Sequence, residues 1–398
     1  MHSADFIQDL AVIMLIAGLV TIVFHRLRQP VVLGYILAGL IIGPYTPPFA
    51  LIRDEHTIRI LSELGVVFLL FALGLEFSLR KLASVGGTAV IAATTEIAVM
   101  LLIGFGIGQY FGWSRMDSIF LGAILSISST TIIIKALGDL KLKNEKFAHL
   151  LFRVPIGEGI LAIAMIALLS ALATTGEVDT NAVLGTLGKL SLFMVVSLVL
   201  GVLIVPRLLE YVARFESAEM LLITVLGLCF GFCLLVVKLD YSIALGAFII
   251  GAIMAESRHL KLIEQLTEPL RDMFSAIFFV SIGLLLDPAV LIRYAGPIAL
   301  ITACVVIGKV ISCSAGAYLA GNDGRTSVKV GMGLAQIGEF SFIIASLGLT
   351  LKVTSDFLYP IAVAVSALTT LLTPYLIRLS DPLTHPASAA MPARLAGW

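Results

Sequence analysis

Three charged residues lie in the middle of long apolar stretches of the sequence: Glu158, Lys309 and Glu339. A charge at such a depth in a membrane is costly unless it is paired or used. A buried carboxylate that both a proton and a cation can reach binds one or the other, and this competition is the chemistry of cation/proton exchange. Lys309 lies too far from either end of its stretch to reach water, so it must find a carboxylate or lose its proton. A Glu158–Lys309 pair that only joins two helices is the alternative.

Two polar interruptions break apolar stretches of membrane-spanning length. Backbone that unwinds at membrane depth must line protein or a cavity, because lipid cannot satisfy its polar groups. A pair of interrupted helices at matching positions is typical of an ion site, although hydroxyls that bond back to helix carbonyls are the alternative. The first interruption, SISSTT, contributes Ser128, Ser129 and Thr130, and the second, AQIGEF, contributes Gln336, Gly338 and Glu339.

The composition places these residues in a membrane. Apolar residues make up 59% of the 398 residues and charged residues 13%, whereas soluble domains carry about 25% charged residues. A stretch of about 20 apolar residues spans a bilayer as a helix. The sequence therefore predicts an all-α polytopic membrane protein of about 13 transmembrane helices. The predicted spans are 5–24, 30–44, 57–77, 86–110, 117–137, 147–173, 182–210, 217–238, 240–256, 265–286, 289–319, 326–351 and 355–379.

The positive charges of the loops predict the orientation. Most Lys and Arg residues fall in alternate loops, beginning with Arg26 and Arg28. Positive loops stay in the cytoplasm, so we expect an odd number of spans, with the N-terminus periplasmic and the C-terminus cytoplasmic. The expected location is the bacterial inner membrane.

An internal repeat relates the two halves of the chain. LGYILAGLIIG, with Gly39, resembles LGAFIIGAIM, with Gly251. Downstream, Gly74 corresponds to Gly283, 209 residues later, and the polar interruptions occupy matching places. Under the predicted topology the two repeats begin on opposite sides of the membrane, and inverted repeats of this kind are typical of transporters. The predicted domain is 1–380, with repeats at about 30–173 and 240–379 and a short cytoplasmic tail at 381–398.

The residues resemble the second monovalent cation:proton antiporter family, which includes Kef-type potassium efflux systems. The strings that carry the resemblance include QPVVLGYILAGLIIGP, LSELGVVFLLFALGLE, LSISSTTIIIKAL, LGAFIIGAIMAES, FSAIFFVSIGLLLDP and LAQIGEFSFIIA. The resemblance implies a sodium/proton antiporter-like fold, a homodimer, and a core that moves like an elevator against a dimerising domain. It also implies that spans five, six, eleven and twelve build the site.

The chain departs from this family in span six, where it reads RVPIGEGILAIAM. Glu158 matches the first polar position of the family pattern, but the essential aspartate falls on Gly159. Arg153 and Pro155 also depart from the pattern, and proline is tolerated only near the start of a helix. Either Glu158 takes over from one position away, or the protein has lost transport, or this stretch is an anomaly of the sequence.

These observations predict an exchanger of potassium or sodium for protons. Glu158 would titrate, Ser128, Ser129 and Thr130 would offer oxygen ligands, and Lys309 would be the counter-charge. An uncoupled cation channel, or a scaffold or sensor without transport, is the alternative. No nucleophile–base pair, metal-ligand spacing or phosphate loop points to an enzyme. We therefore expect no cofactor, no metal beyond the transported cation and no nucleic-acid partner.

Overall fold

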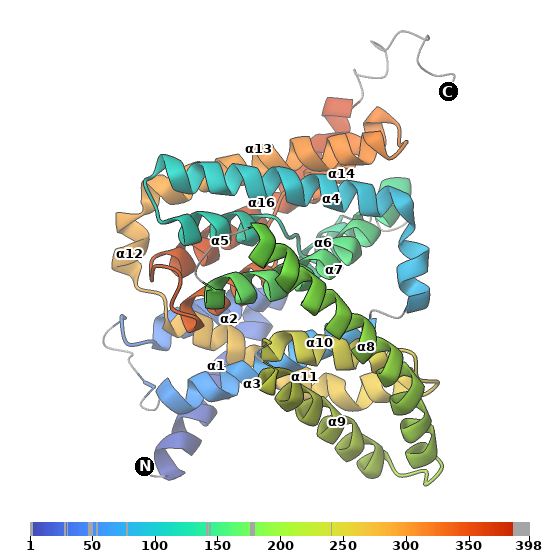
Figure 1. The fold of residues 1–398 in the computed structure, drawn as a ribbon. Helices are drawn as coiled ribbons and strands as arrows, with labels where there is room; N and C mark the ends of the chain where they lie inside the picture. Colours follow the sequence, from blue (N-terminus) through green and yellow to red (C-terminus); the bar gives the residue numbers. More distant parts are fainter. Residues whose placement is uncertain are drawn as a thin grey trace. The chain divides into compact units, whose positions relative to one another are not determined.

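In the computed structural model the chain forms only helices over the residues that the structure describes. These are residues 3–384 apart from positions 28, 30, 47–50, 53–54, 77–78, 141, 143–144, 176–179 and 240. The helices are labelled in Figure 1. Their contacts divide the chain into two compact units. Unit 1 is Met1–Ser84 with Ile163–Asp287, and unit 2 is Val85–Ala162 with Pro288–Trp398.

Each predicted span falls on one helix or on two consecutive helices. Spans five and twelve are each split in two at the predicted polar interruptions, which confirms the pair of discontinuous helices. Seven of the described helices are long and apolar enough to cross a membrane by themselves. The chain is therefore a multi-pass membrane protein, while the count of thirteen crossings stays a prediction.

Unit 1 holds two close helix crossings that the internal repeat relates. A Cβ added to Gly39 would lie 2.8 Å from the Cα of Gly283, and one added to Gly74 would lie 2.9 Å from the Cα of Gly251. The first crossing joins α2 to α11, and the second joins α3 to α10. Because the repeat relates α2 to α10 and α3 to α11, the two crossings are equivalent under a two-fold relation. The helices of unit 1 are α1 (Ser3–Arg26), α2 (Val31–Ile42), α3 (Glu55–Glu76), α8 (Thr180–Ala213), α9 (Ala218–Lys238), α10 (Ile243–Met254) and α11 (Leu260–Leu284).

Unit 2 contains the two split helices and the apolar core around them. Within it α4 packs along α13, with Gly308 against Met100 and Gly316 against Ala92 (Figure 1). Its helices are α4 (Leu79–Tyr110), α5 (Arg115–Leu125), α6 (Thr130–Asp139), α7 (Lys146–Thr175), α12 (Pro288–Arg293), α13 (Ala295–Leu319), α14 (Gly324–Gly333), α15 (Glu339–Thr350) and α16 (Leu358–Thr384). The second part of α7, from Ile163, belongs to unit 1.

One local expectation was wrong. The predicted span 289–319 is two helices that meet at Tyr294, because Pro297 has no N–H and suits the first turn of the second helix. Pro155 lies inside α7, whose bounds agree with the predicted span 147–173. Its ring removes one hydrogen bond of the helix, and both Pro155 and the neighbouring Val154 are buried in unit 2.

Candidate cation site at the crossing of two broken helices

The first break lies between α5 and α6 and is made of serines. The Ser126 hydroxyl donates to the Ala123 carbonyl over 2.9 Å, so it competes with the helix for its last acceptors. The Ser129 hydroxyl accepts from the Ile132 amide over 3.3 Å, as a residue that caps the start of a helix does. The chain therefore leaves one helix and begins the next at Thr130, with residues 126–129 outside both helices.

The second break lies between α14 and α15, and α16 supports it. The Ile337 amide donates to the Thr369 hydroxyl over 3.4 Å, and the Ser366 hydroxyl donates to the Ile337 carbonyl over 3.1 Å. Gly338 precedes the first residue of α15. Backbone groups that the break removes from the helical pattern thus find buried partners, as they must at this depth.

The two breaks are hydrogen-bonded to each other. The Gly338 amide donates to the Ile127 carbonyl over 2.9 Å. The Ser129 amide donates to the Gln336 side-chain oxygen over 3.0 Å, and the Gln336 amide group donates back to the Ser129 carbonyl over 3.3 Å. Ile127 and Gln336 are 209 residues apart, as are Ser129 and Gly338, so the repeat relates these contacts. The split helices therefore cross as repeat-related partners.

Three buried charged side chains surround the first break. The Ser128 amide donates to Glu158 Oε2 over 2.5 Å. Lys309 Nζ donates to Glu96 Oε1 over 2.6 Å and to the Ser128 hydroxyl over 2.8 Å. Glu96, Glu158 and Lys309 are each 0% exposed, and Ser128 is 4% exposed. The carboxyl of Glu96 also accepts from the Ser128 hydroxyl over 3.2 Å, so both carboxyls contact Ser128. All four residues belong to unit 2.

The sequence that forms this cluster matches a known protein family along almost its whole length. The family model of the transmembrane sodium/hydrogen exchangers matches residues 11–378. The chain belongs to the sodium/hydrogen exchanger family. A cation/proton antiporter of Escherichia coli (strain K12), YbaL, is 34% identical over 96% of this chain and 69% of its own. The K(+) efflux antiporter 5 of Arabidopsis thaliana is 33% identical over 94% of this chain and 66% of its own.

The fold agrees with a solved member of the exchangers. The sodium proton antiporter MjNhaP1 from Methanocaldococcus jannaschii superposes with a TM-score of 0.71 over 94% of this chain and 98% of that one, at 18% identity. The predicted sodium/proton antiporter-like fold is thereby confirmed. At the level of the family, the predicted function class, cation/proton antiport, is confirmed too, and neither the channel nor the scaffold alternative is favoured.

The structure brings most of the predicted site residues together. Ser128, Glu158 and Lys309 lie in one cluster, and Ser129 with Gln336 holds the crossing beside it. Gly338 lies in the same crossing, because its amide bonds the first break.

Two predicted site residues are not seen in the cluster among the side chains that the structure describes. Thr130 begins α6 and is half-buried, and no hydrogen bond of its side chain is seen among the described residues. Glu339 begins α15, and its side chain lies outside what the structure describes.

The ion pair of Lys309 was assigned to the wrong carboxylate. Its direct partner is Glu96, in the middle of α4, and not Glu158. Sequence reasoning missed Glu96, although the residue is an isolated charge in the apolar run ATTEIAVMLLIGFG and so carried the same signal as Glu158. Cys313, one turn beyond Lys309 on α13, is also buried.

Gly159, at the position of the family's aspartate, is buried beside Glu158 on α7. A step of one residue turns a side chain by about 100° around a helix. Glu158 therefore approaches the break from a different direction than an aspartate at position 159 would, and its contact is the Ser128 amide.

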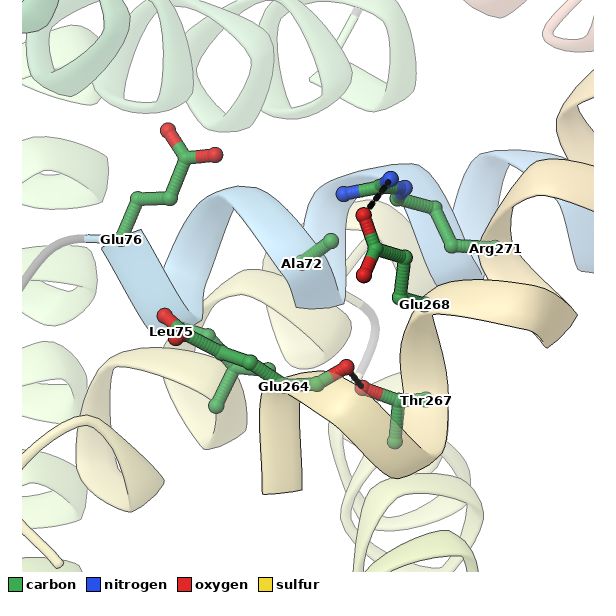
Figure 2. Close-up of a pocket in the computed structure, with 7 residues that line it drawn as sticks. All are labelled: Ala72, Leu75, Glu76, Glu264, Thr267, Glu268 and Arg271. Carbon is green, nitrogen blue, oxygen red and sulfur yellow. Dashed lines mark hydrogen bonds and ion pairs between the residues drawn. The ribbon is translucent and has the colours of Figure 1, made fainter. Parts of the chain in front are cut away.

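A separate acid-lined pocket lies within unit 1 (Figure 2). Its volume is about 240 Å³, and the Arg271 guanidinium pairs with Glu268 over 3.3 Å and with Asp272 over 2.7 Å. These side chains are 31%, 59% and 64% exposed, so water screens the pairs. The pocket is lined by Ala72, Leu75, Glu76, Glu264, Thr267, Glu268 and Arg271.

Proposed function

We propose that this exchanger moves potassium or sodium against protons, and that Glu158 is the carboxylate for which the cation and the proton compete. The observation that carries the proposal is the place of Glu158. Its carboxyl is fully buried, yet it binds the backbone of a broken helix through the Ser128 amide. Its second oxygen, Oε1, has no hydrogen-bond donor among the described residues.

The broken helices supply the remaining requirements of a cation site. The C-terminal ends of α5 and α14 lie at the breaks, and helix C-termini carry partial negative charge on free carbonyls. The Leu334 carbonyl, just after α14, lies 3.3 Å from the Ser128 hydroxyl as an alternative acceptor to Glu96. A cation in this cluster would meet carboxylate, hydroxyl and carbonyl oxygens, which are the ligands that hard cations prefer.

Lys309 supplies the counter-charge for the state without a cation. Its ammonium is fully buried and bonds Glu96 and Ser128, so it compensates part of the negative charge of the cluster. A cation that enters competes with this ammonium for the same oxygens.

We further propose that the protein is a homodimer in the bacterial inner membrane. We also propose a periplasmic N-terminus, which the positive charges of the loops indicate.

The test is proton flux in proteoliposomes that contain a trapped pH dye. Addition of potassium or sodium should change the internal pH for the natural chain and for the control Glu219→Gln, which alters an exposed carboxyl on α9. The change should be absent for Glu158→Gln. An equal response in Glu158→Gln overturns the proposal, and so does cation flux without proton flux. Silence of the natural chain with activity in Gly159→Asp would mean a scaffold that lacks its carboxylate.

A further inference from the structure

We infer that Glu96 is a second ligand of the transported cation, so that Glu96 and Glu158 together replace the aspartate that this chain lacks at Gly159. The inference rests on the proposed exchange and assigns the binding site within it. Glu96 comes from α4, whereas Glu158 comes from α7, and the two carboxyls contact opposite parts of Ser128. Glu158 accepts from its amide and Glu96 from its hydroxyl, over 3.2 Å.

Each of these carboxyls keeps one oxygen without a donor. Glu96 Oε2 and Glu158 Oε1 are buried and have no hydrogen-bond partner among the described residues. Buried polar atoms are rarely left in this condition, and a buried carboxylate oxygen is the most costly of them. Both carboxyls contact Ser128, Glu158 at its amide and Glu96 at its hydroxyl, so a single positive group beside this residue could serve both orphan oxygens.

The charges of the cluster select the class of ligand. Two carboxylates and one ammonium leave a single negative charge when all three groups are ionised. One monovalent cation neutralises the cluster, whereas a divalent cation would leave a buried positive charge, which is costly. Glu96 contacts the Lys309 ammonium and the Ser128 hydroxyl, and Glu158 contacts the Ser128 amide. The neighbouring oxygens and the charge balance therefore fit a dehydrated potassium or sodium ion.

A rival role for Glu96 is only to hold Lys309 in place. The two roles predict opposite effects of removing the ammonium. If Glu96 is a ligand with which Lys309 competes, the loss of Lys309 strengthens cation binding. If Glu96 only compensates Lys309, the removal of both partners of the pair is tolerated, as it often is for buried ion pairs, and Glu158 alone still binds the cation.

The experiment measures the affinity of the full chain in detergent for potassium and for sodium by titration calorimetry at alkaline pH. We expect Glu96→Gln to weaken the affinity at least about tenfold, because a charged ligand is lost. Lys309→Gln should bind more tightly than the natural chain, and Glu96→Gln with Lys309→Gln should stay as weak as Glu96→Gln alone. Thr302→Ala, which removes a buried hydroxyl of α13 that bonds the Ile298 carbonyl and lies outside the break, should keep the natural affinity.

The outcomes separate this inference from the function on which it rests. Natural affinity in the double variant assigns Glu96 to holding Lys309 and overturns the inference. If Glu96→Gln alone fails to fold, the double variant still tests whether Glu96 binds the cation, because the double variant contains no unpaired Lys309 ammonium. Exchange by the natural chain together with an unchanged apparent cation affinity in Glu96→Gln overturns the inference alone. Absence of both binding and exchange in the natural chain overturns the proposed function as well.

Discussion

Replacement of Gly338 by alanine should separate the two broken helices. Gly338 has φ −103° and ψ −171°, a conformation that any residue adopts, so the cost of a side chain here comes from space and not from backbone strain. A Cβ at this position would lie 2.8 Å from the Ser129 nitrogen and 2.9 Å from the Ser128 carbonyl carbon and oxygen. These are backbone atoms that cannot rotate away, so the two segments themselves must move apart.

The size of the effect follows from the hydrogen bonds across the crossing. Separation of the two broken helices breaks two hydrogen bonds. One runs from the Gly338 amide to the Ile127 carbonyl over 2.9 Å, and the other from the Ser129 amide to the Gln336 side-chain oxygen over 3.0 Å. Each leaves a buried donor without a partner, which costs about 1–3 kcal/mol. The expected loss in free energy of unfolding is therefore about 2–6 kcal/mol, and the melting temperature should fall by on the order of 10 °C.

Thermal unfolding in detergent measures this effect, with Gly106→Ala as the matched control. Gly106 lies in α4 of the same unit, and a Cβ there would meet no atom within 4 Å. Alanine in a helix is favoured over glycine, so the control should melt at or slightly above the natural temperature. A Gly338→Ala protein that melts with the control and exchanges cations at the natural rate would refute the tight crossing.

Three further substitutions test the site and its frame. Ser128→Ala removes the hydroxyl that contacts Lys309 and Glu96, so exchange in proteoliposomes should fall well below that of Thr302→Ala, and equal rates would contradict the site. Gly39→Leu should lower the melting temperature far more than Gly18→Leu, since a Cβ at Gly18 would meet no atom within 4 Å. Gly159→Asp adds a carboxyl to a buried negative cluster. It should lower the melting temperature without cations and enlarge the stabilisation by added potassium or sodium, and equal stabilisation would contradict the charge count.

The positions of the two breaks could be predicted because their causes are local. Serine hydroxyls compete for helix carbonyls, and a glycine before Glu339 leaves the chain free to start a new helix. The repeat then indicated that the breaks correspond. The sequence could not predict that Gly338 and Gln336 bond the first break, because those contacts join residues more than two hundred positions apart.

The partner of Lys309 could not be predicted for a different reason. A buried lysine in a membrane requires a carboxylate, but any isolated acid in an apolar span satisfies that requirement. The choice between Glu96 and Glu158 depends on how α4 and α7 are turned about their axes in unit 2. Close glycine contacts, such as Gly308 of α13 against Met100 of α4, set that rotation for α4. These contacts cannot be predicted from the residue pattern of α4 alone.

If Glu158 and Glu96 bind the cation as proposed, the site accounts for exchange without an acid at Gly159. Competition between a cation and a proton needs a buried carboxyl next to unwound backbone, and it does not require that the carboxyl come from one particular helix position. In this chain the amide and the hydroxyl of Ser128 each bond a different carboxyl, Glu158 and Glu96. The break that holds Ser128 is fixed in turn by the bonds between Ser129 and Gln336. Under the proposal, exchange of a proton for a cation at either carboxyl therefore acts on the same hydrogen-bonded crossing.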